Sequence, residues 1–228
     1  MQQSVFDISV RLFRISGRKE ISAIKLQKLM YYAYGWYGRL TGKPLFEQHF
    51  YAMRYGPVVG ELLTLHSAQK TISPDLIEVG RSALEDVPLE TDVYVEQLLS
   101  AVWEYYGDID PWKLVEMTHK ESPWMNAWSA RLEDTRRAVL DGQDIIEFFL
   151  YRSDMDSGFA ALLPPAQVTP ITVEDMYVLE SFDAAVGERA RDIFWEREAV
   201  GSSPATPTER TSDVCVREVR GRRSTQHM

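Results

Sequence analysis

The sequence predicts a mainly α-helical fold: a compact multi-helix domain with a small two-stranded β element, followed by an appended C-terminal helix and a disordered tail. Apolar residues recur at the three-to-four-residue spacing of amphipathic helices through most of the chain. Glycine, proline and capping side chains bracket these segments, and only one stretch, near residue 50, alternates as a strand does. With 228 residues, 45% of them hydrophobic, the chain can fill such a core.

Two helices are predicted at the N-terminal end of the domain. Val5 to Ile15 carries one apolar stripe and stops before Gly17. Ser22 offers a capping hydroxyl to a second helix, which runs to Leu40 and is followed by Gly42. This second helix is apolar or aromatic nearly all round, which is typical of a helix at the centre of a domain.

A short β element follows the second helix. Side chains alternate between Phe46 and Tyr55 as in a strand, and Leu76 to Val79 offers a second extended stretch for pairing. Gly56-Pro57 is predicted to end the strand and to begin a short helix that runs to His66. Proline suits the first helical position because no amide hydrogen bond is lost there.

Four more helices complete the predicted domain. An amphipathic stripe runs from Tyr94 to Tyr106. Asp110-Pro111 and Ser122-Pro123 each place a capping side chain before a proline, which is typical of a helix start. A capping box that begins at Asp144 introduces the segment Ile145 to Tyr151.

The chain divides into four parts. Residues 1–155 form the main domain, residues 156–171 a linker around Pro164-Pro165, and residues 172–199 an appended helix. Residues 200–228 are rich in Ser, Pro, Thr and Arg, so burial cannot offset the cost of ordering them, and we expect a disordered tail. An alternative origin of the tail is a reading frame that runs into a transfer-RNA gene, because residues 200–208 can be back-translated into a T-arm core.

The charge of the chain bears on its partners. The formal net charge is −9, and residues 1–199 alone carry −11, from 20 Lys and Arg against 31 Asp and Glu. An acidic body repels a phosphate backbone, so nucleic acid is not expected as the primary ligand. Opposite charge steers encounter between proteins, which favours a basic protein partner.

Composition also bears on the compartment. No stretch approaches the roughly 20 apolar residues that span a membrane, and the first residues lack the basic and apolar parts of a signal peptide. The single cysteine, Cys215, cannot form an internal disulfide. We expect a soluble cytoplasmic protein that does not bind membranes.

No catalytic, cofactor or metal site is predicted. The four histidines form no His-Glu-x-x-His pair, and one cysteine cannot build a metal site. The best polar pair is His119 with Glu121, for which hydrogen bonds to the main chain at a helix junction are the favoured interpretation. The catalytic alternative needs a nucleophile or base that the sequence does not identify, so we do not expect an enzyme.

Basic and aromatic residues of the second helix leave several interpretations open. Lys25 and Lys28 lie on one flank of this helix. Three interpretations are open: the flank is a solvated face, its lysines pair with a carboxylate elsewhere in the fold, or the flank contacts a partner. Gln27 and Tyr31 lie on another face. Aromatic rings are enriched at interface centres, but a buried and internally satisfied tyrosine is commoner, so the core interpretation is favoured for these residues.

Two further motifs are mainly structural. Glycine permits a turn and proline fixes the next helix, so Arg54-Tyr55-Gly56-Pro57 is predicted to hold a strand-to-helix corner. Trp124 and Trp128 form a large apolar ridge one helical turn apart, which belongs to the core by default and to a partner surface as the alternative.

Three motifs in order carry a family resemblance: KLQKLMYY at residues 25–32, RYGPVV at 54–59 and THKESPW at 118–124. Together they resemble the Panacea-domain proteins, which include SocA-like antitoxins and phage-associated GepA-like proteins. The resemblance runs from Val5 to Leu150 and implies a mainly α-helical domain.

The resemblance implies an antitoxin that neutralises a cognate protein toxin by direct binding. The alternative is a phage-encoded or prophage-encoded interaction protein, or a proteolytic adaptor, that acts on a host protein. A host protease or chaperone is a further possible partner. The candidate residues of the family motifs and of partner binding are Lys25, Gln27, Lys28, Tyr31, Arg54, Tyr55, Gly56, Pro57, His119 and Trp124.

Overall fold

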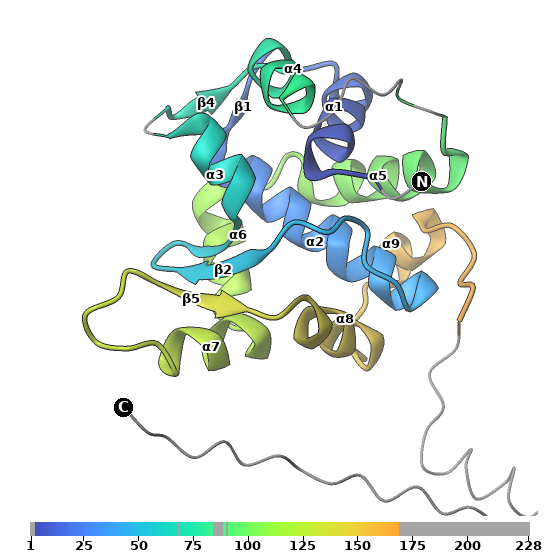
Figure 1. Ribbon diagram of the computed structural model, residues 1–228. Coiled ribbons are helices and arrows are strands. Elements are labelled where there is room, and N and C mark those ends of the chain that lie inside the picture. The colour runs from blue at the N-terminus through green and yellow to red at the C-terminus, as the bar shows by residue number, and fades with distance from the viewer. Residues whose placement is uncertain (1–2, 68, 84–88, 90, 169–228) are drawn as a thin grey trace, which may run out of the picture. The chain divides into compact units, whose positions relative to one another are not determined.

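A computed structural model describes residues 3–67, 69–83, 89 and 91–168 of the protein (Figure 1). The appended helix predicted at 172–199 and the tail predicted at 200–228 lie outside these described residues. The predicted mainly α fold is confirmed for the described part. Its helices are α1 (Val5–Ser16), α2 (Ala23–Thr41), α3 (Gly60–His66), α4 (Pro74–Ser82), α5 (Val93–Tyr106), α6 (Pro111–Thr118), α7 (Ser122–Ser129), α8 (Gly142–Leu150) and α9 (Ser157–Leu162).

The central helix α2 is buried along most of its length, as its all-round apolar sequence predicts. It packs against α1, α5, α6 and α8, which surround it in Figure 1. Its closest neighbour is α8, because a Cβ atom on Gly35 would lie 2.4 Å from the Phe149 ring. The helix begins where Ser22 accepts a hydrogen bond from the Lys25 amide and ends at Gly42 in the left-handed conformation.

The strands form two small antiparallel sheets. One has three strands in the order β3 (Gly56–Val59), β2 (Phe50–Met53) and β5 (Arg137–Leu140), and the other pairs β1 (Ile21–Ser22) with β4 (Thr71–Ile72). The predicted strand at residue 50 is therefore present, but its partners are β3 and β5.

Two predictions about this sheet are wrong. Leu76 to Val79 is helical, because the Ser73 side chain accepts from the Leu76 amide and Pro74 opens α4. Gly56-Pro57 begins a strand, and the following helix starts only at Gly60. Pro57 is tolerated because β3 is an edge strand, where a missing amide donor breaks no ladder.

Helix starts were predicted more accurately than their capping residues. Asp110 caps α6 as expected and accepts from the Trp112 amide at 2.8 Å. Glu121, and not Ser122, is the capping position of α7. Asp141, and not Asp144, caps α8. The predicted linker at 156–171 contains a further short helix, α9, whose Phe159 is buried against Trp36.

Candidate partner-binding site

The three sequence motifs converge on one buried junction. The first lies on α2, the second supplies the turn and the second strand of the β2–β3 hairpin, and the third joins α6 to α7. Lys28 Nζ donates to the Pro57 carbonyl at 2.8 Å, and Trp124 Nε1 donates to the Met53 carbonyl at 2.9 Å. The first and third motifs therefore each fix the hairpin through a long side chain that bonds to its main chain.

Gln27 fixes the edge of the sheet. The Val59 amide donates to Gln27 Oε1 at 2.8 Å, and Gln27 Nε2 donates back to the Val59 carbonyl at 3.4 Å. A side-chain amide thus takes the place of a neighbouring strand beside β3. His66 lies 3.4 Å from the same Gln27 nitrogen. The core interpretation of Gln27 agrees with its 2% exposure.

Lys28 is almost completely buried, with 1% of the residue exposed. Among the described residues no carboxylate forms an ion pair with it, and its Nζ donates to the Pro57 carbonyl. Burial lowers the pKa of Lys28 to about 7. The interpretation of a solvated flank is wrong for this residue. Lys25 instead reaches the C-terminal end of α5, where its Nζ donates to the Gly107 carbonyl.

Gly56 allows this packing for two reasons. Its φ of +90° favours glycine, and a Cβ atom there would lie 2.7 Å from both Lys28 Cε and Thr118 Oγ1. These two neighbours come from the first and third motifs. The glycine of the second motif is therefore the point where all three motifs touch.

Gly56→Ala is expected to lower the free energy of unfolding by about 3 kcal/mol, because backbone strain and overpacking add. Gly17→Ala is the matched control: Gly17 also has a positive φ, of 62°, but no atom within 4 Å of the added methyl. It should cost only about 1 kcal/mol. Urea denaturation of both variants measures the difference, and equal losses would show that packing at the junction contributes nothing.

The third motif adds a stack of rings next to the hairpin. The His119 ring lies 3.9 Å from the Trp124 ring at 15°, and Trp128 continues the stack at 5.8 Å. Burial, followed by the charge of Lys28, lowers the pKa of His119. Trp124 is 8% exposed, so the core interpretation of that ring fits, while Trp128 is half-buried.

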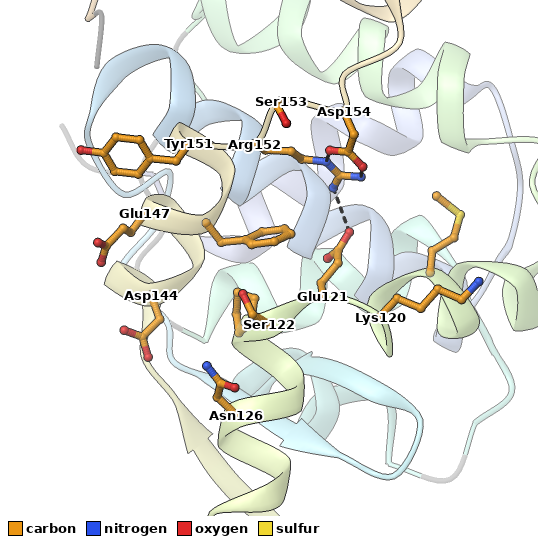
Figure 2. A pocket seen from close by; sticks show the side chains of 13 residues that line it. Lys120, Glu121, Ser122, Asn126, Asp144, Glu147, Tyr151, Arg152, Ser153 and Asp154 are labelled. Carbon is orange, nitrogen blue, oxygen red and sulfur yellow. Dashed lines mark hydrogen bonds and ion pairs between the residues drawn. The ribbon is translucent and has the colours of Figure 1, made fainter. Parts of the chain in front are cut away.

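Glu121 points away from the hairpin into a second buried polar cluster. Arg152 donates to Glu121 Oε1 at 2.9 Å and to both oxygens of the exposed Asp154, and Figure 2 shows the guanidinium between the two carboxylates. These three residues help to line a pocket of about 790 Å³ between α7 and α8. The predicted main-chain role of Glu121 is replaced by this ion pair.

Two tyrosines of the first motif lie behind Glu121. The hydroxyls of Tyr31 and Tyr32, like Glu121 Oε2, are buried and make no hydrogen bond of regular geometry with the described residues. Burial, followed by the charge of Glu121, raises the pKa of both tyrosines. Tyr31 has no exposed surface, so it belongs to the core and offers no direct contact to a partner in this structure.

The outer side of the junction is a groove of about 1400 Å³, which we call the basic groove. The elements that form it lie at the left of Figure 1: the start of α2, the hairpin tip, the end of α3, β4 and the loop after α7. Five of the described residues that line it are Lys or Arg, and none is Asp or Glu. Arg54, Lys70, Arg131 and Arg136 are cations outside the buried junction, and the fifth residue is the buried Lys28.

Aromatic rings stand at the rim of the basic groove. Tyr55 and Trp112 are 48% and 53% exposed, and their rings meet edge to face at 5.3 Å. Arg131 Cζ lies over the Trp128 ring, 3.9 Å from its centroid, and Arg131 Nη1 donates to the Trp128 carbonyl at 3.0 Å. Exposed aromatic and arginine side chains of this kind are typical of binding surfaces.

The predicted residues thus divide into two groups. Gln27, Lys28, Arg54 and Tyr55 line the basic groove. The remaining six, which support the groove from behind or lie apart from it, are Lys25, Tyr31, Gly56, Pro57, His119 and Trp124. Four groove residues were missed by sequence reasoning because they lie outside the motifs: Lys70, Trp112, Arg131 and Arg136. The proline-tryptophan pair at 111–112 was noticed only as a helix start.

Comparison with known proteins identifies the domain. Residues 26–125 match the family model described as Antitoxin SocA-like, Panacea domain. Residues 26–125 are therefore similar to a Panacea domain. The matched part of the chain runs from α2 into α7 and so contains the junction almost entirely. No curated protein and no solved structure shows a significant match to the chain.

No group of three or more His, Cys, Asp and Glu side chains within residues 3–67, 69–83, 89 and 91–168 could hold a metal ion. Over the same residues, no helix is long and apolar enough to cross a membrane.

Proposed function

We propose that this protein is an antitoxin that neutralises a cognate protein toxin by direct binding, without a catalytic step. The observation that carries the proposal is the match of residues 26–125 to an antitoxin domain. A protein encoded by a bacterium or its prophage, acting in the cytoplasm on a toxin made beside it, fits this assignment.

The basic groove supports a binding role. It is hollow, lies on the outside of the motif junction and combines apolar walls with cationic and aromatic side chains. Binding energy at protein interfaces is concentrated in a few aromatic and arginine residues of this kind. Tyr55 and Trp112 at the rim, and Arg131 on Trp128, are therefore the anchors that we assign to the toxin interface.

Co-expression with the adjacent open reading frame tests the proposal. If the neighbour is toxic, expression of this protein is expected to restore growth, and the two proteins are expected to co-purify. A toxic neighbour that is neither rescued nor co-purified would contradict the assignment.

Titration separates binding from catalysis. In a purified activity assay of the toxin, inhibition by binding is expected to be complete near equimolar amounts of the two proteins. With less antitoxin than toxin, only the bound fraction of the toxin should be inhibited. Inactivation of a many-fold excess of toxin would show turnover and would overturn the non-enzymatic part of the proposal.

Toxin abundance separates two ways of neutralising it. Direct blockade leaves the cellular level of toxin unchanged while growth is restored. Delivery to a host protease, as by an adaptor, lowers the toxin level, and this decrease disappears when the protease is deleted. We propose blockade, so an immunoblot is expected to show undiminished toxin.

A further inference from the structure

We propose that the basic groove binds an acidic segment of a protein partner, with a large apolar side chain against its walls and carboxylates against its cations. This inference rests on the proposed function only in taking that partner to be the toxin. It assigns the contact surface and the chemistry of the segment, neither of which follows from the family.

Charge is the first argument. The chain carries a formal net charge of −9, yet the described residues that line this groove include four cations outside the buried junction and no acid. The charge of the groove is therefore opposite in sign to that of the chain as a whole. A concave surface lined by one sign of charge attracts ligand groups of the other sign, and like-charged segments are rejected.

The walls of the groove favour a peptide. Ile24, Met53, Val58 and Leu63 supply apolar surface between the cations. A nucleic-acid strand gains affinity mainly from repeated phosphate contacts. Outside the groove, the net negative charge of the chain repels such phosphates. A peptide with an aromatic or aliphatic anchor uses both the apolar walls and the cations.

One cation is held in place before binding. Arg131 is fixed by the Trp128 ring and the Trp128 carbonyl, and its buried Nε has no hydrogen-bond partner among the described residues. Such a side chain loses little further entropy when a carboxylate arrives, so it contributes more than a mobile surface lysine does.

Charge reversal tests the groove against the product of the adjacent reading frame. The variant Arg54→Glu/Lys70→Glu/Arg136→Glu changes exposed groove cations without touching the buried junction. Its matched control, Lys19→Glu/Lys43→Glu/Lys120→Glu, makes the same change of charge at exposed lysines outside the groove. Circular dichroism and thermal melting establish that both variants are folded.

The groove variant is expected to bind the adjacent product roughly fivefold more weakly per reversed charge, and so on the order of 100-fold more weakly in all. The control should stay within about threefold of the unmodified protein, since its charges lie outside the contact. Isothermal titration measures both. Equal affinity of the groove variant, or an equal loss in the control, overturns the proposal.

A second experiment does not depend on the toxin. Random dodecapeptides displayed on phage are selected on the full chain, and eluted clones are compared for binding to the groove variant and the control. Enrichment of Asp and Glu around an aromatic or aliphatic residue, with binding lost only in the groove variant, supports the proposal. Enriched peptides without acidic residues, or undiminished binding to the groove variant, overturn it.

An oligothymidylate of similar length completes this experiment as the nucleic-acid probe. If this probe binds the unmodified protein, we expect it to bind the groove variant as well. Binding that is tighter than that of the selected peptides and lost in the groove variant would replace the peptide assignment by a nucleic-acid one. If the adjacent product fails to bind at all while acidic peptides bind in the groove, the toxin assignment fails and the groove assignment stands.

Discussion

Replacing Arg152 by methionine is expected to lower the free energy of unfolding by about 4 kcal/mol at neutral pH. Glu121 is 5% exposed, and Arg152 is its ion-pair partner in the described residues, at 2.9 Å. Loss of the guanidinium leaves a buried carboxylate whose second oxygen makes no hydrogen bond of regular geometry with the described residues. Urea denaturation followed by circular dichroism measures the loss.

The loss should depend on pH. Burial raises the pKa of Glu121, against Tyr31, Arg152 and Tyr32, which lower it. Without Arg152 this pKa rises further, so the folded variant binds a proton that the unfolded chain releases. Stability of the variant then falls as pH rises through the folded pKa and recovers as pH falls. The deficit relative to the unmodified protein is expected to shrink between about pH 7 and about pH 5.

Two controls separate the ion pair from other effects. Asp154 is an exposed partner of the same guanidinium, so Asp154→Asn should cost below about 1 kcal/mol. Glu121→Gln combined with Arg152→Met should be more stable than Arg152→Met alone, because the uncompensated charge is gone. If the loss of unfolding free energy in the double variant equals the sum of the losses in the two single variants, Glu121 and Arg152 are not energetically coupled.

Lys28 is expected to make the stability of the protein rise with pH. Burial lowers its pKa from 10.5 to about 7 in the folded state. Between these two values the unfolded chain binds the proton and the folded chain does not, so the free energy of unfolding increases as pH rises. The gain amounts to about 2–3 kcal/mol between about pH 6 and about pH 9, out of roughly 5 kcal/mol over the full range.

Lys28→Met removes this titration and serves as the reference. The variant leaves the Pro57 carbonyl without its donor, which is a constant cost at all pH values. The difference in unfolding free energy between the unmodified protein and the variant should therefore grow with pH. A difference that stays constant between about pH 6 and about pH 9 would mean that Lys28 titrates as an exposed lysine does.

Sequence patterns predicted the helices well where the signal is local. The boundaries of α1 and α2 follow from apolar stripes, serine caps and glycine ends that lie within a few residues of each other. The sheet was predicted less well. Leu76 to Val79 resembles a strand in composition, but Ser73 and Pro74 immediately before it start a helix. One of the two partners of β2, the strand β5 at 137–140, lies 84 residues or more beyond β2, and no local signal marks that pairing.

The sequence by itself determined the domain, through three motifs whose residue types the fold needs. Gln27 and Lys28 bind the main chain of the hairpin, and Gly56 lets Lys28 approach it. Trp124 binds the hairpin main chain from the third motif. Only the tertiary structure decided which of these residues a partner can reach. Burial placed Tyr31 in the core and lowered the pKa of Lys28, and both follow from segments that are distant in the chain. The basic groove joins motif residues with Lys70, Trp112, Arg131 and Arg136, and such a surface is created by packing, which local periodicity does not encode.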